Sequence, residues 1–354
     1  MNILFMGTPD FAQKSLEKIY EAGHNIIAVV TNPDRPKGRG MKMIASPVKE
    51  YAIEKNIPVY QPEKVRNNQE IIEKIKELNP EVICVVAYGK ILPKEILEIP
   101  KLGSINVHGS LLPKYRGAAP IQWAVLNGDK TTGVTTMYMD EGMDTGDMIL
   151  KEEVEIGENE TTGELWEKLA EVGGNLLVKT LEQIENGTAP REKQGEEFTI
   201  APMLNKEMAK IDWEEKTARG IKNLVRGLNP IMGTYSFLNG KKLKIWKVQT
   251  LTNEVFMDKY EEFKEYKQKF ENVAPGVIIY IDKKEGIYVK AKDGIILLLE
   301  VQAENAKKMN VQDFLRGNKI EVGEMFEWNF KILINKKMKV FFKKLSFFVY
   351  SMIE

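Results

Sequence analysis

The spacing of apolar and polar positions along the chain changes between the pattern of a strand and the pattern of a helix. This spacing predicts the secondary-structure elements. In the first half, short apolar runs alternate with segments of helical spacing, a pattern typical of a parallel sheet with helices on both faces. The predicted strands are Asn2–Met6, Ile26–Val30, Val59–Tyr60, Val82–Ala87, Gly103–His108, Val134–Met139 and Met148–Ile156; the clearest helices are Phe11–Ala22, Gln69–Leu78, Ala119–Leu126 and Thr161–Glu185. We therefore predict an α/β domain over residues 1–187.

The first strand, turn and helix form a Rossmann-like opening. The turn reads GTPDFA and lacks the glycines of the GxGxxG motif, which let a pyrophosphate approach the backbone. The sequence thus favours a Rossmann-like, mostly parallel sheet and disfavours dinucleotide binding.

The second half of the chain has a different pattern. Residues 188–206 are polar and contain two prolines, so we expect a linker there. Five short strands with turn signals follow over residues 207–328, and they predict a smaller β-barrel domain. These strands are Gly233–Leu238, Leu243–Leu251, Gly276–Ile281, Gly286–Ala291 and Gly294–Val301.

Length and composition agree with two domains of an ordinary globular protein. The chain has 354 residues, which suffice for two apolar cores. Its single cysteine, Cys84, lies in an apolar run, so we expect an inert buried thiol and no disulfide scaffold. The amino terminus is expected to be a first strand and not a signal peptide, and no run is long enough for a membrane helix. We predict a cytoplasmic protein.

The net charge of zero conceals an uneven distribution. Residues 1–190 carry 21 Lys and Arg against 28 Asp and Glu, whereas residues 206–250 carry 10 against 4. A basic region of this kind is compatible with a polyanion partner, although a solvated basic surface would look the same.

Candidate chemistry is concentrated in the segment GSINVHGSLLPKYRGAAP, residues 103–120. Because side chains alternate along a strand, Asn106 and His108 share one face, opposite Ile105 and Val107. An imidazole can transfer protons near neutral pH, and an amide can donate to a developing oxyanion. Both residues could equally be structural hydrogen-bonding groups at a strand end.

A second segment, MDEGMDTGD at residues 139–147, adds a carboxylate. This acidic, glycine-containing loop lies between two apolar runs, and Asp144 could orient or charge-stabilise an imidazole. A carboxylate, a histidine and an asparagine together would form an apparatus for acyl transfer. A solvated turn is the alternative.

The sequence resembles the formyltetrahydrofolate-dependent transferases, most closely the members that formylate initiator methionyl-tRNA. The resemblance runs from residue 2 to about residue 327, and the catalytic set shows no departure from it. The matching motifs are NVHGSLLP at 106–113, YRG and AAP at 115–120, GTPDF at 7–11, NPDRP at 32–36, GRG at 38–40, SPVK at 46–49, AYG at 87–89 and DTGD at 144–147.

The resemblance implies that the formyl group of 10-formyltetrahydrofolate is transferred to the methionine α-amine. Asn106, His108 and Asp144 would be catalytic, and residues 139–144 would offer backbone groups to the pterin ring. Ser110, Leu111, Leu112 and Pro113 would bind the donor. Two exposed leucines there would suit its flat apolar part. No metal is expected, because two distant histidines and one cysteine form no ligand cluster.

The resemblance also implies a tRNA partner and a monomer, with an OB-like barrel as the second domain. Residues 31–46 form a long polar loop that would meet the acceptor end of the tRNA, with Arg39 as the contact, unless it is only a surface loop. Lys241, Lys242, Lys244 and Lys247 lie on or beside one strand, so some must share a face. The first three are the predicted tRNA-binding lysines.

Three other functions remain open. A formyltransferase for another amine, such as glycinamide ribonucleotide or an amino-sugar, would keep the catalytic set without needing the Arg39 loop or the basic domain. A formyltetrahydrofolate hydrolase would direct water to the same carbonyl. A non-catalytic RNA-binding module would explain the basic stretch but not the carboxylate, amide and imidazole set.

Two segments depart from the family pattern. Residues 254–272 are a charged, aromatic insertion, predicted to be a helix or a mobile excursion. Residues 329–354 form an atypical tail with six lysines and no acid before Glu354. We expect a poorly packed extension; a basic tRNA arm or a membrane-surface helix is the alternative.

Overall fold

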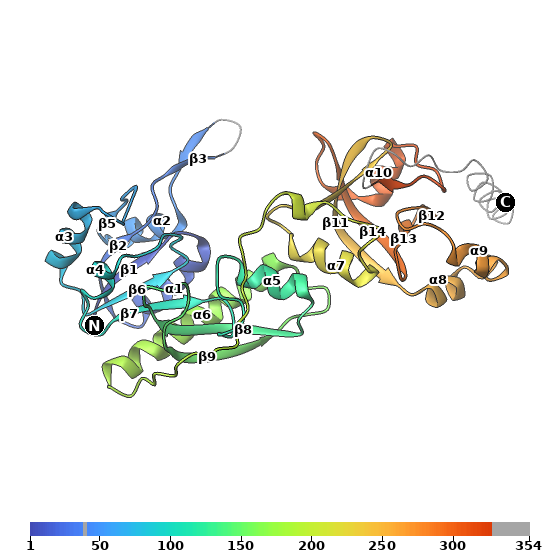
Figure 1. The fold of residues 1–354 in the computed structure, drawn as a ribbon. Coiled ribbons are helices and arrows are strands. Elements are labelled where there is room, and N and C mark those ends of the chain that lie inside the picture. Colours follow the sequence, from blue (N-terminus) through green and yellow to red (C-terminus); the bar gives the residue numbers. More distant parts are fainter. Residues whose placement is uncertain (38–40, 328–354) are drawn as a thin grey trace. The chain divides into compact units, whose positions relative to one another are not determined.

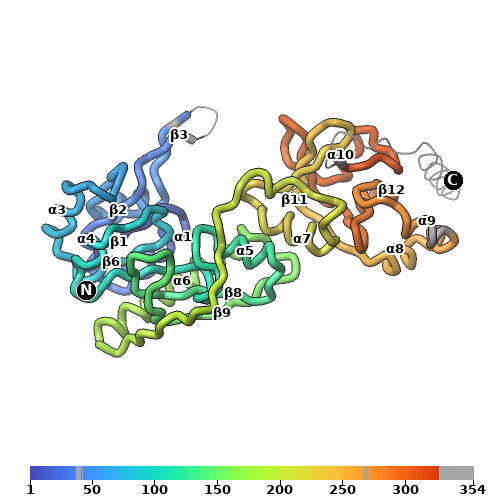
Figure 2. Tube along the Cα trace, viewed as in Figure 1, coloured from blue at the N-terminus to red at the C-terminus, as the bar shows by residue number. Residues whose placement is uncertain are grey.

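The computed structural model describes residues 1–37 and 41–327, and the chain divides into two compact units (Figure 2). Unit 1 comprises Met1–Ala124, Asp129–Glu158 and Glu164–Met203. Unit 2 comprises Val125–Gly128, Asn159–Gly163 and the chain from Leu204 onward. Each unit has its own sheet and its own apolar core.

Unit 1 contains a seven-stranded sheet in the order β5-β2-β1-β6-β7-β8-β9 (Figure 1). The first five of these strands are parallel, and β8 and β9 are antiparallel to their neighbours. The strands are β1 (Asn2–Gly7), β2 (Asn25–Val30), β5 (Val59–Tyr60), β6 (Val82–Val86), β7 (Ser104–His108), β8 (Thr131–Tyr138) and β9 (Met148–Glu155). The predicted Rossmann-like, mostly parallel sheet is confirmed.

Helices cover both faces of this sheet. Leu4 and Val85 point toward one face and join the core under α3 and α4. On the other face, Gly173 of α6 packs so closely on the sheet that a Cβ there would lie 3.1 Å from Val107. The helices that lie wholly or mostly in unit 1 are α1 (Asp10–Glu21), α2 (Pro47–Glu54), α3 (Gln69–Leu78), α4 (Lys94–Leu97), α5 (Pro120–Asn127) and α6 (Thr162–Glu185).

The long polar loop after β2 has more structure than the sequence indicated. Two short strands, β3 (Arg35–Lys37) and β4 (Lys42–Ile44), pair antiparallel within it. Its base is closed by a hydrogen bond of 2.8 Å between the Thr31 and Ser46 hydroxyls. Arg39 itself lies in residues 38–40, outside the described residues.

The expected linker packs along unit 1. We call residues 188–203 the strap. Its Glu192 pairs with Met148 of β9 through two backbone hydrogen bonds of 2.8 and 2.9 Å. Farther along, the Ala201 N–H donates to the Arg116 carbonyl at 2.7 Å. Composition alone suggested a free linker because polar side chains give no sign of backbone pairing.

Unit 2 is an antiparallel barrel in the order β12-β13-β14-β11-β10-β16, with β15 added beside β14. The sheet closes on itself, because Ile278 N donates to Glu324 O at 2.7 Å and Phe326 N to Gly276 O at 2.8 Å. The strands are β10 (Thr234–Leu238), β11 (Lys241–Leu251), β12 (Ile278–Asp282), β13 (Gly286–Lys290), β14 (Ile295–Ala303), β15 (Met309–Asn310) and β16 (Phe326–Glu327). The five predicted strands are confirmed.

Outside the insertion at 254–272, the chain from Leu204 to Glu327 has three helical segments: η1 (Glu207–Ala209), α7 (Ala218–Gly227) and α10 (Val311–Gly317). A fully buried Trp213 stacks on Phe326, with ring centroids 5.4 Å apart, inside the core of the barrel. Burial of such aromatic pairs supplies a large share of core stability.

The insertion at 254–272 folds as α8 (Asn253–Lys259), η2 (Glu261–Tyr266) and α9 (Lys267–Glu271). It has its own apolar cluster around Phe256, which is fully buried and lies 5.0 Å from Phe263 and 5.6 Å from Phe270 between ring centroids. Of the two predicted possibilities, a helix is confirmed.

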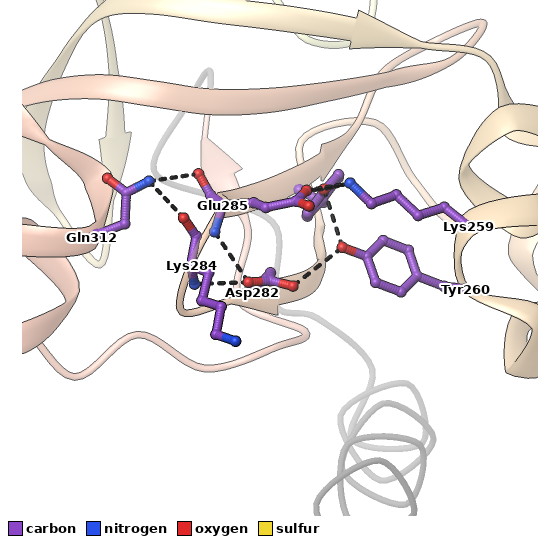
Figure 3. Close-up of polar contacts among 7 residues, drawn as sticks. Lys259, Tyr260, Asp282, Lys284, Glu285 and Gln312 are labelled. Carbon is purple, nitrogen blue, oxygen red and sulfur yellow. Dashed lines mark hydrogen bonds and ion pairs between the residues drawn. The ribbon is translucent and has the colours of Figure 1, made fainter. Parts of the chain in front are cut away.

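A polar network connects the end of α8 to the turn between β12 and β13 (Figure 3). Lys259 forms an ion pair with Glu285, and the Tyr288 hydroxyl donates to the same carboxylate. The Tyr260 hydroxyl lies 3.3 Å from the Asp282 carboxylate and 3.1 Å from the Tyr288 hydroxyl.

Cys84 is fully buried in β6, and burial raises the pKa of its thiol, which agrees with an inert cysteine. Within residues 1–37 and 41–327, no helix has the length and apolar character needed to cross a membrane. The tail at 329–354 lies outside the described residues.

Candidate active site

β7 carries Asn106 and His108 to the carboxyl end of the parallel part of the sheet. Its bounds are Ser104–His108, one residue shorter at the start than the predicted Gly103–His108. Asn106 lies opposite Val85 of β6, so it shares the sheet face that Val85 occupies, as alternation requires. Ligands of such sheets bind beyond this end of the strands.

The imidazole of His108 is held between two groups of the protein. It is 6% exposed, and its Nε2 lies 2.9 Å from the backbone oxygen of Tyr115. Because a carbonyl can only accept, Nε2 must carry the hydrogen. The other nitrogen, Nδ1, lies 3.7 Å from the Asp144 Oδ1. The structure therefore brings the predicted carboxylate and imidazole together.

Asp144 lies in the loop between β8 and β9, in the left-handed backbone region with φ +55°. Its second carboxylate oxygen, Oδ2, accepts the Gly117 N–H at 2.8 Å. The base of the loop is closed by a backbone hydrogen bond of 2.9 Å from Tyr138 to Asp147. One carboxylate thus contacts both the imidazole and the loop that follows β7.

The side-chain amide of Asn106 differs from the His108 imidazole because it has no hydrogen-bond partner among the described residues. Its side chain is half-buried and makes no hydrogen bond to the described residues. It can donate to a new oxyanion without losing an existing partner. The Nε2–H of His108 can do so only by sharing or breaking its hydrogen bond to Tyr115.

The predicted donor-binding residues 110–113 lie in the loop that follows β7. Ser110 is fully buried, and its hydroxyl donates to Lys114 O at 2.5 Å. The expectation of two exposed leucines is wrong. Leu112 is 2% exposed and packs with Met137 and Met148, and Leu111 is half-buried. The sequence could not reveal this burial, because it depends on strands 25 and more residues away.

Four other residues of the site, Arg116, Tyr115, Gln194 and Thr199, were not assigned a role from the sequence. The Gln194 amide donates to the backbone oxygens of Asp144 and Gly146 at 2.8 and 2.9 Å. The same amide accepts from the Arg116 Nε at 2.9 Å. Tyr115 N donates to the Thr199 hydroxyl at 2.8 Å. No sequence pattern marks the backbone oxygen of Tyr115 or the glutamine Gln194 as part of a site. Arg116, in contrast, lies within the motif segment 103–120.

The predicted tRNA-binding lysines lie on β11 of unit 2. Lys242 and Lys244 share the outer face of the strand with Trp246, whereas Lys241 is exposed at its start. The Lys242 ammonium lies 3.7 Å from the centre of the Tyr235 ring, and the Lys244 ammonium donates to Met232 O at 2.9 Å. This face combines cations and aromatic rings, a composition suited to nucleic acids.

In the part of the chain that the structure describes, no group of three or more histidines, cysteines or acids could hold a metal ion.

Comparison with known proteins identifies the family. The formyl transferase model matches residues 1–181, and the model of the formyl transferase C-terminal domain matches residues 203–319. The chain belongs to the formyl transferase family. It is 54% identical over 324 residues to the methionyl-tRNA formyltransferase of Clostridioides difficile (strain 630), covering 91% of this chain and 99% of that protein. It is 50% identical over 328 residues to that of Clostridium tetani (strain Massachusetts / E88), covering 92% and 100%.

Solved structures show the same fold at lower identity. HypX from Aquifex aeolicus, in complex with tetrahydrofolic acid, has a TM-score of 0.59 and 15% identity, covering 93% of this chain and 51% of that one. The sugar 3N-formyl transferase WlaRD has a TM-score of 0.59 and 21% identity, covering 87% and 99%.

Proposed function

We propose that this formyl transferase moves the formyl group of 10-formyltetrahydrofolate to the α-amine of methionine on initiator methionyl-tRNA and so supports translation initiation. The similarity at about half identity along nearly the whole length of named methionyl-tRNA formyltransferases supports this substrate. The cluster of Asn106, His108 and Asp144 at the end of β7 supports the chemistry.

The reaction needs no covalent intermediate on the enzyme. An α-amine has an ordinary pKa of about 8, so part of it is neutral at pH 7 and can attack the formyl carbon directly. A C–N bond forms to the amine, and the bond from the formyl carbon to N10 of the folate breaks. The proton that the new ammonium loses balances the proton that N10 gains.

The enzyme stabilises the oxyanion of the tetrahedral intermediate. The Asn106 amide is the preformed donor, because it is not engaged elsewhere. The His108 imidazole is the second donor when it exchanges the Tyr115 carbonyl for the oxyanion. The Asp144 carboxylate lies 3.7 Å from the ring and presents a negative charge to it, and either Asp144 or a water accepts the proton of the amine.

Residues 110–113 form the proposed donor site beside this pair. Leu111 and Pro113 are its half-exposed members and offer the apolar contact, whereas Ser110 and Leu112 shape the turn from within. The Thr135 hydroxyl fixes that turn by accepting from Leu112 N at 3.0 Å and donating to Ser110 O at 2.7 Å.

The tRNA would be bound through Arg39 in the loop after β2 and through Lys241, Lys242 and Lys244 on β11. A guanidinium on a loop can contact phosphates or bases of the acceptor end, and the lysines can contact the backbone. We further propose that the enzyme works in the cytoplasm as a monomer.

The test is an assay with 10-formyltetrahydrofolate and charged tRNAs. We expect formyl-methionine to form on initiator methionyl-tRNA and much more slowly on elongator methionyl-tRNA. Formate release without tRNA would identify a hydrolase instead. Transfer to glycinamide ribonucleotide or an amino-sugar, with none to tRNA, would identify a formyltransferase for another amine.

A further inference from the structure

The strap, residues 188–203, contacts both loops that face His108. Its Thr199 holds the loop after β7 through two hydrogen bonds of 2.8 Å, from Tyr115 N to the hydroxyl and from Arg116 N to the carbonyl. Its Gln194 holds the loop between β8 and β9 through the backbone oxygen of Asp144. The two groups that face the imidazole are therefore both attached to one segment.

These two groups lie on strained backbone. Tyr115 has φ +61° and Asp144 has φ +55°, and neither is a glycine. A left-handed conformation at a residue with a Cβ costs free energy and persists only where surrounding contacts impose it. The contacts of the strap are of this kind. Gly117 shows how closely the strap approaches, because a Cβ there would lie 2.8 Å from Ala201 O.

The Gln194 side chain uses both its nitrogen and its oxygen to connect the two loops. Its nitrogen donates to Asp144 O at 2.8 Å and to Gly146 O at 2.9 Å, and its oxygen accepts from the Arg116 Nε at 2.9 Å. Arg116 is 8% exposed, and its guanidinium stacks on Phe198 at 4.4 Å, so this donor is itself fixed. The amide thus sets the distance between the Asp144 loop and the loop that carries Tyr115.

We propose that Gln194 is a positioning residue for formyl transfer, which acts by holding the Asp144 carboxylate against His108. This inference rests on the proposed function. The Gln194 side chain bonds to Asp144, Gly146 and Arg116 and not to His108, and its proposed role needs no contact with either substrate. Its effect passes through Asp144, and a small displacement of a group that acts in the transition state is costly in rate.

Gln194→Ala and Gln194→Glu test the proposal, with Lys193→Ala on the same strap as the matched control. The glutamate keeps an acceptor for Arg116 but cannot donate to Asp144 O and Gly146 O. We expect both Gln194 variants to lose about 10- to 100-fold in kcat. KM for each substrate should stay within about twofold, and Lys193→Ala should behave as wild type.

A Gln194→Glu variant with wild-type kcat would overturn the proposal, since the two donated hydrogen bonds would then be dispensable. If wild type and Lys193→Ala formylate no methionyl-tRNA, the proposed function fails. That result is distinct from a failure of the Gln194 role.

A double-mutant cycle separates positioning from general structural support. When Gln194→Ala is added to an Asp144→Asn variant, the single-turnover rate should fall no more than about twofold. The reason is that the side chain that Gln194 positions has already lost its charge. The same fold loss in both backgrounds would mean that Gln194 does not act through Asp144, and would overturn the proposal.

A readout independent of turnover uses the two histidines of the chain, His24 and His108. In protein with labelled histidine rings, Gln194→Glu should shift the NMR signals of the His108 ring and leave those of His24 in place. His108→Gln assigns the signals. An unmoved His108 signal in a folded Gln194→Glu protein would contradict the proposal.

Discussion

Asp144 uses its two carboxylate oxygens on different partners: Oδ1 lies 3.7 Å from the Nδ1 of His108, and Oδ2 accepts the Gly117 N–H at 2.8 Å. A single side chain therefore supplies a negative charge to the imidazole and connects two loops. These two roles respond differently to substitution, because an uncharged side chain of the same shape can retain the second and not the first.

Asp144→Asn should separate the charge from the loop contact. An amide oxygen can still accept from Gly117, so we expect a folded protein with an unchanged Tm. The negative charge that faces the imidazole is lost, and kcat should fall about 10²–10³-fold. Quenched-flow formylation of initiator methionyl-tRNA measures this. A near-normal kcat would remove the carboxylate from the mechanism.

Asn106→Ala removes the unengaged donor. We expect a loss of about 10²–10³ in kcat, which corresponds to roughly 2.7–4 kcal/mol of transition-state stabilisation, with folding intact. His108→Ala should have an effect of similar size. Steady-state kinetics with both substrates measures each loss. A variant that retains wild-type kcat would exclude that residue as an oxyanion donor.

The sequence predicted the part of this site that depends on local geometry. The alternation of side chains in the predicted strand placed Asn106 and His108 on one face, and the strand of the structure, Ser104–His108, contains both residues. A turn between β8 and β9 was also expected from its glycines and acids. The shared strand face follows from the two-residue period of a strand, and the turn follows from its residue types. Both are properties of neighbouring positions in the sequence.

The rest of the site depends on contacts between distant segments, and no local pattern encodes them. The partner of the His108 Nε2 is a backbone oxygen, which every residue has. Gln194 lies in a stretch that looks like a linker, yet it is bonded to Asp144, 50 residues earlier. Leu112 looks like a ligand contact and is buried by Met137 and Met148.

Phe256→Ala should destabilise unit 2. Phe256 is fully buried at the centre of the aromatic cluster of the insertion, so truncation leaves a cavity. We expect a loss of about 3–5 kcal/mol in the free energy of unfolding. Urea unfolding measures it, with the neighbouring, 54% exposed Val255→Ala as control at about 0.5 kcal/mol or less. A small loss at Phe256 would mean that the insertion contributes little to stability.

The network of α8 and the β12–β13 turn should make unit 2 sensitive to alkali. Burial is the main cause that raises the pKa of both Tyr260 and Tyr288. A group with a raised folded-state pKa contributes stability that is fully present below the unfolded pKa, about 10 for tyrosine, and is lost as pH rises beyond it. Unfolding free energy should therefore fall above about pH 10.

Tyr288→Phe removes one of these titrations, so its unfolding free energy should decline less steeply between about pH 10 and pH 11. Urea unfolding at several pH values compares the variant with wild type. The exposed Tyr20, 39% accessible, offers the control substitution Tyr20→Phe, which should leave the slope unchanged. Parallel curves for Tyr288→Phe and wild type would contradict this origin of the alkaline loss.

Lys241, Lys242 and Lys244 should determine part of the salt dependence of tRNA binding. Each lysine that neutralises a phosphate releases counterions, so replacing all three with alanine should raise KM for tRNA and reduce the slope of log affinity against log salt by up to about 3. Lys242 also covers the Tyr235 ring, and Lys244 donates to Met232 O, so thermal unfolding of the triple variant must be measured as well.

The control is Lys74→Ala, at an exposed lysine on α3 of unit 1, which should change neither KM for tRNA nor the salt slope. KM for 10-formyltetrahydrofolate should stay constant, because the proposed donor site lies after β7 and not on the barrel. A triple variant with wild-type KM and salt slope would show that this face of the barrel does not bind the tRNA backbone.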